Sequence, residues 1–211
     1  MPSAVPTPTV QQSVRAVPAH EDWKPNIKFR NSVVYNELNA WPRADVFVPF
    51  SGPTSPLSNF WHCSLEYRDQ LYYSSEHAYQ AMKALCAGSP ENARAIRAAD
   101  TAARAKHIAR FVSLDDQQRQ EWETLKVGVM KDILTTKYQQ CMEFRDALQG
   151  GCVYVETTRD KFWGAGVTKE EFRSRGMSFE GKNVLGALLT QLAHEGHLEK
   201  VLWPALPQKD M

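Results

Sequence analysis

Apolar side chains in the second half of this 211-residue chain recur at three- and four-residue steps, the spacing of one face of a helix. The positions that follow this spacing are Trp122, Leu125, Val129 and Ile133. Ser113 and Asp116 have the S-x-x-D form of a capping box, so we expect a core helix from this point to about Tyr138.

Shorter helices are expected on either side of it, at about residues 90–99, 101–110 and 142–148. Ser89 followed by Pro90 is typical of an N-cap and a first helical residue. Asp100 or Thr101 can cap the next helix. Residues 167–180, in contrast, are polar and irregular, so we expect a flexible loop there that can act as a lid.

Segments rich in β-branched and aromatic residues predict the strands. Residues 45–50 predict a first core strand, and residues 152–157 predict a second. Residues 62–67 and 70–73 flank a two-residue turn, which favours a hairpin. The second strand of this hairpin leads directly into a further predicted helix.

That helix, SSEHAYQAMK, carries chemically useful side chains at helical spacing. Glu76, Gln80 and Lys83 fall on one stripe, which Tyr79 borders. The opposite side is apolar and should be buried; its members are Ala78, Met82, Leu85 and Cys86. With Ser74 or Ser75 as the N-cap, the glutamate lies in the first turn, where the helix dipole favours a carboxylate. Stabilising that dipole is the simplest role for such a glutamate.

Charge and cysteine content narrow the functional classes. Lys and Arg total 25 against 24 Asp and Glu, a net charge of +1, so the chain lacks the global basic field of a nonspecific nucleic-acid binder. The four cysteines form no C-x-x-C pair, which indicates reduced thiols. Neither a membrane span of roughly 18 to 20 apolar residues nor a hydrophobic signal core is present. We therefore expect an intracellular protein, cytoplasmic or nuclear, without a membrane segment.

The composition also divides the chain. Residues 1–25 contain scattered prolines without periodicity, which predicts a disordered tail. Residues 26–200 are long enough for one domain with a real core, and residues 201–211 are expected to form a C-terminal tail. Within the domain, one run is locally basic and predicts either a solvated helix surface or a contact surface for phosphates. Its members are Arg94, Arg97, Arg104, Lys106 and Arg110.

Short motifs occur along the chain in a characteristic order. They are PLSNF at 56–60, SSEHAYQAMK at 74–83, WETLKVGVMK at 122–131, DKFWGAG at 160–166 and GKNVLGALL at 181–189. In order and spacing they resemble the NADAR family, over about residues 46–192. The resemblance implies an α+β fold: a single compact, mostly helical domain with a small β-sheet. The chain departs from the family pattern at Thr190 and Ala193, where methionine and arginine are usual.

The resemblance also implies hydrolysis of an N-glycosidic bond, without a cofactor and without a metal. The substrate we expect is ADP-ribosylated guanine in DNA or RNA, with ADP-ribose as a product. One alternative is cleavage of an early riboflavin-pathway intermediate on the same fold. Another is a module that binds ADP-ribose or NAD without turnover. No protein partner can be named from the sequence.

An N-glycosidic bond breaks through an oxocarbenium-like sugar, so the site must stabilise positive charge and assist the leaving base. We assign the acid/base role to Glu76, and Asp160 is a second carboxylate that positions the ribose or water. Lys83 is either a cation that pairs with substrate phosphates or a nucleophile. In the second case, desolvation lowers the pKa of its amine, which attacks the anomeric carbon to form a Schiff base.

The remaining site predictions concern substrate binding. Ser58 and Asn59 are expected to bind ribose hydroxyls, and Tyr79, Trp122 and Trp163 are expected to form aromatic walls. The helical spacing of Trp122 equally fits core packing. Further contacts expected within the matched motifs are Phe60, His77, Gln80 and Phe162.

Backbone conformation contributes the last candidates. Gly164 and Gly166 lie where the chain should turn sharply and approach the ligand. Lys182 and Asn183 precede a helix whose N-terminal N–H groups suit a pyrophosphate.

Overall fold

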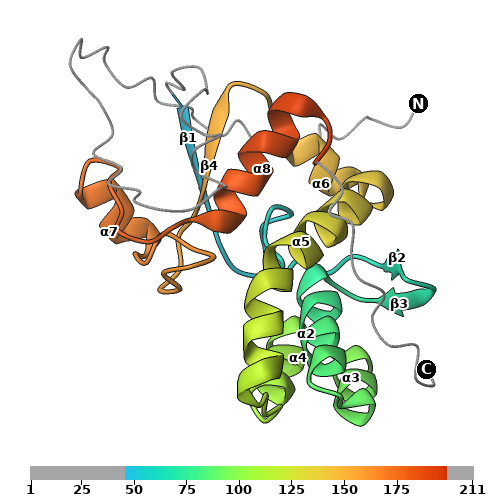
Figure 1. Ribbon diagram of the computed structural model, residues 1–211. Coiled ribbons are helices and arrows are strands. Elements are labelled where there is room, and N and C mark those ends of the chain that lie inside the picture. Colours follow the sequence, from blue (N-terminus) through green and yellow to red (C-terminus); the bar gives the residue numbers. More distant parts are fainter. Residues whose placement is uncertain (1–45, 199–211) are drawn as a thin grey trace, which may run out of the picture.

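The structure, a computed structural model, describes residues 46–198. The tails predicted at residues 1–25 and 201–211 lie outside that range, as do the ends of the predicted domain. Within it, the fold is α+β and mostly helical, as expected from the sequence (Figure 1). The strands form two separate two-stranded sheets rather than one small sheet.

The first sheet joins segments that are far apart in the sequence. Strand β1 (Val46–Phe50) pairs in parallel with β4 (Cys152–Glu156), so that Phe50 lies opposite Glu156. Thr157 extends the pairing, because its backbone N–H donates to the carbonyl of Phe50 at 2.9 Å. Parallel pairing places the carboxyl ends of both strands at one edge, from which two loops continue.

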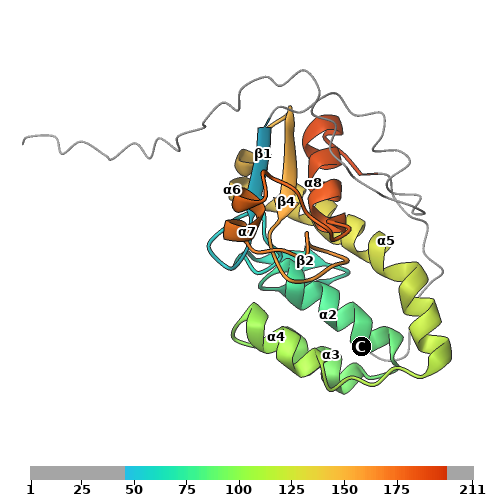
Figure 2. The same ribbon diagram turned by 90° about the vertical axis from the view of Figure 1, so that its left-hand side faces the viewer.

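Helix α8 (Val184–Glu195) covers β4 (Figures 1 and 2). Gly186 permits this close packing, because a Cβ atom there would lie 2.2 Å from the carbonyl oxygen of Tyr154. Thr190 accepts a hydrogen bond from the backbone N–H of Tyr154 at 2.9 Å. A methionine, which the family resemblance leads one to expect at this position, has no hydroxyl to accept that bond.

A group of helices forms the other side of the molecule (Figure 2). These helices are α2 (Ser75–Cys86), α3 (Pro90–Arg97), α4 (Ala102–Ala109) and most of α5 (Asp116–Gln140), while the short α6 (Met142–Ala147) lies near β1. Helix α2 packs against α3, α4 and α5 at once. It is consequently buried on both faces, and its predicted polar stripe is not exposed, since Glu76 is only 4% and Gln80 only 9% exposed.

The predicted hairpin is confirmed as β2 (Leu65–Tyr67) and β3 (Gln70–Tyr72). Arg68 and Asp69 both have positive φ angles, 52° and 59°, which suits the right-handed twist of a two-residue hairpin turn. The hairpin delivers the chain to Ser74, which caps α2 by accepting from the backbone N–H of His77.

Two local predictions were wrong. The capping box of α5 is formed by Asp115 and Gln118, two residues after the expected Ser113, because the N-cap must lie directly before the first helical residue. Residues 167–180 are not wholly irregular, because they contain α7 (Lys169–Ser174). Thr168 and Glu171 cap this helix reciprocally, and Phe172 is 1% exposed in a small second core.

Candidate active site

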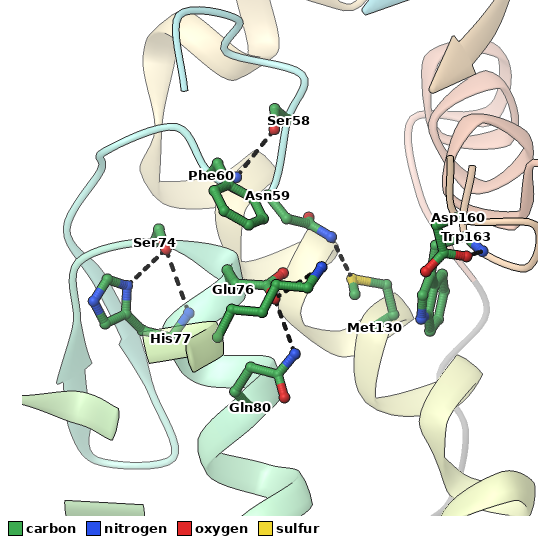
Figure 3. A network of polar contacts seen from close by, with 11 residues as sticks. Ser58, Asn59, Phe60, Ser74, Glu76, His77, Gln80, Met130, Asp160 and Trp163 are labelled. Atoms are coloured by element: carbon green, nitrogen blue, oxygen red, sulfur yellow. Dashed lines mark hydrogen bonds and ion pairs between the residues drawn. The ribbon is translucent and has the colours of Figure 1, made fainter. Parts of the chain in front are cut away.

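The site lies where the loops that follow β1 and β4 meet the start of α2 (Figure 3). The PLSNF loop is held by Lys137, a fully buried lysine whose ammonium donates to the carbonyls of Pro56 and Ser58 at 2.7 and 2.8 Å. Burial lowers the pKa of Lys137 to about 8. The loop in turn fixes α2, because the backbone N–H of Glu76 donates to the carbonyl of Asn59 at 3.0 Å.

Glu76 is the centre of a buried polar network (Figure 3). Its Oε1 accepts from Gln80 Nε2 at 2.9 Å and lies 3.6 Å from Lys106 Nζ, which comes from α4. Burial raises the pKa of the Glu76 carboxyl, whereas Lys106 and Gln80 act against this rise. The Glu76 carboxylate is thus desolvated and also paired with a cation and an amide. Such a perturbed pKa is typical of groups that exchange protons in active sites.

Glu156, the last residue of β4, is a second buried carboxyl beside Glu76. Burial raises its pKa to about 8; Glu76 and Asp160 add to the rise, and Lys106 opposes it. The Oε2 atom is covered and has no hydrogen-bond partner within residues 46–198. We call Glu76, Glu156 and Asp160 the carboxyl cluster.

Asp160 has a different setting, because it is exposed. Its Oδ1 accepts from the backbone N–H groups of Phe162 and Trp163, both at 2.7 Å. These two bonds fix the carboxylate at the start of the DKFWGAG turn, on the opposite side of the site from Glu76 (Figure 3).

A cavity of about 590 Å³ adjoins the cluster and has Asp160 in its wall. Its other lining residues are Tyr79, Lys83, Val112, Ser113, Leu114, Arg119, Trp122, Glu123, Lys126, Phe162 and Trp163. The Tyr79 ring lies 5.2 Å from that of Trp122 and 5.4 Å from that of Trp163, centroid to centroid. Lys126 Nζ lies 3.7 Å from the centre of the Phe162 ring. Aromatic rings and cations thus both line the cavity, together with apolar side chains and carboxylates.

Comparison with known proteins identifies the family. The family model for the NADAR domain matches residues 46–195, which is most of the chain. The chain belongs to the NADAR family. N-glycosidase YbiA of Escherichia coli (strain K12) is 30% identical over 157 residues, 73% of this chain and 89% of that protein. N-glycosidase Npun_R5314 of Nostoc punctiforme is 27% identical over 136 residues, 63% of this chain and 83% of that protein.

Two further relatives extend the comparison. The riboflavin biosynthesis protein VVA0006 of Vibrio vulnificus is 31% identical over 142 residues, which are 66% of this chain but only 35% of that protein. The NMR structure of YbiA from E. coli superposes with a TM-score of 0.57 at 27% identity, covering 70% of this chain and 83% of that one. The names of the relatives support a glycosidase, and the superposition confirms the NADAR fold.

The structure brings together many of the residues predicted from the NADAR motifs. Glu76 and Gln80 lie in the network with Lys106, and Phe60 lies beneath Lys106, with its ring centre 5.3 Å from Nζ. Other predicted residues line the cavity: Tyr79, Lys83, Trp122, Asp160, Phe162 and Trp163. Trp122 satisfies both interpretations of its pattern, since it is 6% exposed and still borders the cavity.

The side chains of Asn59 and its neighbour Ser58 differ in their hydrogen-bond partners. The side-chain amide of Asn59 donates to Met130 Sδ at 3.5 Å, and its Oδ1 is buried without a hydrogen-bond partner in the described part of the chain. Ser58 is 2% exposed and its hydroxyl accepts from the backbone N–H of Phe60 at 3.1 Å. The Ser58 hydroxyl thus shapes the loop, and its predicted bond to the ribose stays a prediction.

Both ring nitrogens of His77, which was predicted to contact the substrate, have partners within the protein. One ring nitrogen lies 2.7 Å from the Ser74 hydroxyl and the other 3.1 Å from the carbonyl of Ala99. Figure 3 shows the contact with Ser74, on the side of His77 away from Glu76. Burial lowers the pKa of His77, in keeping with a neutral ring that joins α2 to the α3–α4 connection.

The anion site predicted at the start of α8 is not available. Backbone N–H groups of Val184 and Leu185 already donate to the carbonyls of Phe162 and Trp163. The Asn183 side chain bonds the backbone of Tyr154 and Glu156 at 2.9 Å each, so it fastens α8 to β4. Lys182 is exposed and lies 5.4 Å from the centre of the Phe162 ring, outside the cavity lining.

The two glycines of DKFWGAG also have structural partners. A Cβ on Gly164 would lie 2.2 Å from Thr158 Oγ1, and Gly166 has a φ of 74°. The chain does turn sharply and make a close approach, as predicted, but it approaches its own backbone.

Sequence reasoning missed two members of the network. Lys106 was placed only in a basic run, and Glu156 only in a strand. The position of Glu156 at a strand end directly before a matched motif is a signal that could have identified it. Among residues 46–198, no group of three His, Cys, Asp or Glu side chains is arranged to hold a metal ion, and no helix is long and apolar enough to span a membrane.

Proposed function

We propose that this protein is an N-glycosidase that hydrolyses the bond between ADP-ribose and a guanine base in DNA or RNA. The observation that carries the proposal is the carboxyl cluster, whose member Asp160 also lines a cavity rich in aromatic and cationic side chains. Membership of the NADAR family supports the reaction type, since the relatives named above include N-glycosidases.

The cluster supports the chemistry of N-glycoside hydrolysis. The reaction develops positive charge at the anomeric carbon, and carboxylates nearby stabilise that charge. In this proposal Glu76 exchanges a proton, and Asp160, which belongs to the cluster and also lines the cavity, positions the ribose or the water. The unpaired Oδ1 of Asn59 suits a hydroxyl donor of the sugar.

The cavity supports a nucleotide-sized ligand. A volume of about 590 Å³ lies within the usual range for small-molecule sites. Trp122, Tyr79 and Trp163 provide surfaces for stacking a base. Lys83 and Arg119 line the same space and can pair with phosphates of the ADP-ribose, whereas Lys126 is ion-paired with Glu123.

A second candidate reaction is hydrolysis of a riboflavin-pathway intermediate, favoured by the name of the Vibrio relative. Such an intermediate also carries an N-glycosidic bond, so the same cluster would serve. A third candidate is a module that binds ADP-ribose or NAD without turnover. Because these candidates share a cavity, products separate them better than affinities do.

The test is incubation with an ADP-ribosylated-guanine oligonucleotide, NAD and a riboflavin-type glycoside, followed by mass spectrometry. We expect unmodified oligonucleotide and free ADP-ribose, with little cleavage of NAD, and loss of products with the Glu76→Gln variant. Cleavage confined to NAD or to the riboflavin-type glycoside would reject the guanine substrate. Binding of ADP-ribose without any product would support the module.

A further inference from the structure

Carboxyl groups outnumber cations where the loops after β1 and β4 join α2. The groups that act on one another there are the carboxyls of Glu76, Glu156 and Asp160 and the ammonium of Lys106. With all of them ionised, a largely buried space would hold an excess of negative charge, which is unfavourable. One proton bound to a carboxyl relieves this repulsion.

The hydrogen bonds decide which carboxyl holds the proton. Glu76 has two partners that stabilise its carboxylate form, the Gln80 amide at 2.9 Å and Lys106 at 3.6 Å. Asp160 accepts two backbone N–H bonds. Glu156 has neither kind of partner at Oε2, which is buried and unpaired in the described residues. The proton is therefore most stable on Glu156.

We propose that Glu156 is the catalytic acid of this site, and that Glu76 acts beside it as the base. This assignment rests on the proposed N-glycosidase function and divides its acid and base roles between two residues. Glu156 comes from the end of β4 to act on Glu76; the residue as a whole is half-buried, and its Oε2 is covered. A pair of carboxyls in different environments, one protonated and one ionised, is the arrangement that glycoside hydrolysis uses.

The bond changes balance as follows. The bond between the anomeric carbon and the base nitrogen breaks, and Glu156 gives its proton to that nitrogen. Water attacks the anomeric carbon, forming the new carbon–oxygen bond, and gives a proton to the Glu76 carboxylate. One proton then moves from Glu76 to Glu156 through solvent, which restores both groups, so the net change is addition of water.

The assignment predicts a definite pH dependence. Glu156 must be protonated to act, and burial, with Glu76 and Asp160, raises its pKa to about 8 against the opposing effect of Lys106. Turnover should therefore fall as the pH rises through about 8. In the Glu156→Gln variant the amide has no acidic proton to give, so this fall should disappear along with most of the rate.

A titration without substrate tests the protonation state directly. In protein labelled with ¹³C at glutamate carboxyls, we expect one carboxyl signal to titrate near pH 8 and to vanish in Glu156→Gln. In Glu76→Gln the midpoint should shift down, because a neighbouring negative charge is removed. If every glutamate carboxyl titrates below pH 6, the inference is overturned.

Kinetics supply the second test, on whichever N-glycoside the wild-type protein cleaves. Glu156→Gln should lower kcat on the order of a hundredfold and lose the fall above pH 8, while Glu66→Gln, an exposed strand glutamate, should leave both unchanged. An unchanged pH profile in Glu156→Gln overturns the inference. If the wild type cleaves none of the glycosides, the proposed function fails, and the titration still decides whether Glu156 holds the proton.

Discussion

The carboxyl cluster and the adjoining cavity differ in their exposure and in the side chains that form them. The cluster is small, with Glu76 buried, Oε2 of Glu156 covered and Asp160 exposed, and Lys106 is its nearest cation. The cavity is open and lined by aromatic rings that contact one another. Asp160 belongs to both. The contrast indicates a division of labour in which the cluster performs the chemistry and the cavity holds the substrate, so that changes in each should affect different kinetic constants.

The largest effect should come from the cluster. Glu76→Gln keeps the shape of the side chain but cannot exchange a proton, so kcat should fall at least about a hundredfold, on the order of 3 kcal/mol, with little change in KM. Steady-state kinetics measure this. Glu91→Gln is the matched control, because Glu91 occupies the first turn of α3 but is exposed. Wild-type rates in a folded Glu76→Gln would reduce Glu76 to a helix-dipole partner.

Substitution of a residue that lines the cavity should raise KM and leave kcat nearly unchanged. Trp163→Leu removes a ring that contacts Tyr79, so KM should rise about tenfold while kcat stays within a few fold, as expected for the loss of one stacking surface. Phe111→Leu, at an aromatic side chain that is 72% exposed and outside the cavity lining, is the control. A drop confined to kcat would contradict the division of labour.

Lys83 lines the cavity, and we expect it to act there as a cation rather than as a nucleophile. Lys83→Met should raise KM a few fold, on the order of one lost ion pair with a phosphate. Borohydride added during turnover should trap no adduct on intact protein. A stable ADP-ribose adduct mapped to Lys83, with turnover abolished in Lys83→Met, would instead establish the Schiff-base route.

The smallest effect concerns stability. The pKa of Glu156 is raised in the folded state from its ordinary 4.5 to about 8. Its protonation therefore stabilises the fold fully below 4.5, and this contribution is lost progressively as the pH rises from 4.5 through about 8. Glu156→Gln should therefore melt about 5 °C higher than wild type at pH 9, on the order of 2 kcal/mol, and show a smaller gain at pH 5. Thermal melts at both values measure it; a lower melting temperature at pH 9 would argue against a destabilising charge.

Local signals predicted the elements of the fold well. The Arg68-Asp69 hairpin, the Ser74 cap and the core spacing of α5 depend on neighbours within a few residues, and all are present. Helix α7 was missed, although Thr168 and Glu171 form the capping-box pattern, because a helix this short offers little periodicity.

The site was predicted only in part, because it depends on contacts between distant segments. Lys106 reaches Glu76 from a different helix, and Glu156 reaches it only because β4 pairs in parallel with β1. Nothing in the local pattern specifies that pairing. The same limit applies to Ser58 and His77, whose hydrogen-bonding groups are engaged by backbone and side-chain atoms that the motifs do not reveal.

The most direct test of the division of labour is calorimetric binding of ADP-ribose to two variants compared with wild type. If the cluster performs chemistry and the cavity binds, Glu76→Gln should bind ADP-ribose with the wild-type Kd, and Trp163→Leu should bind it about tenfold more weakly, a difference of about 1.4 kcal/mol. The reverse result, weak binding by Glu76→Gln and unchanged binding by Trp163→Leu, would contradict the account.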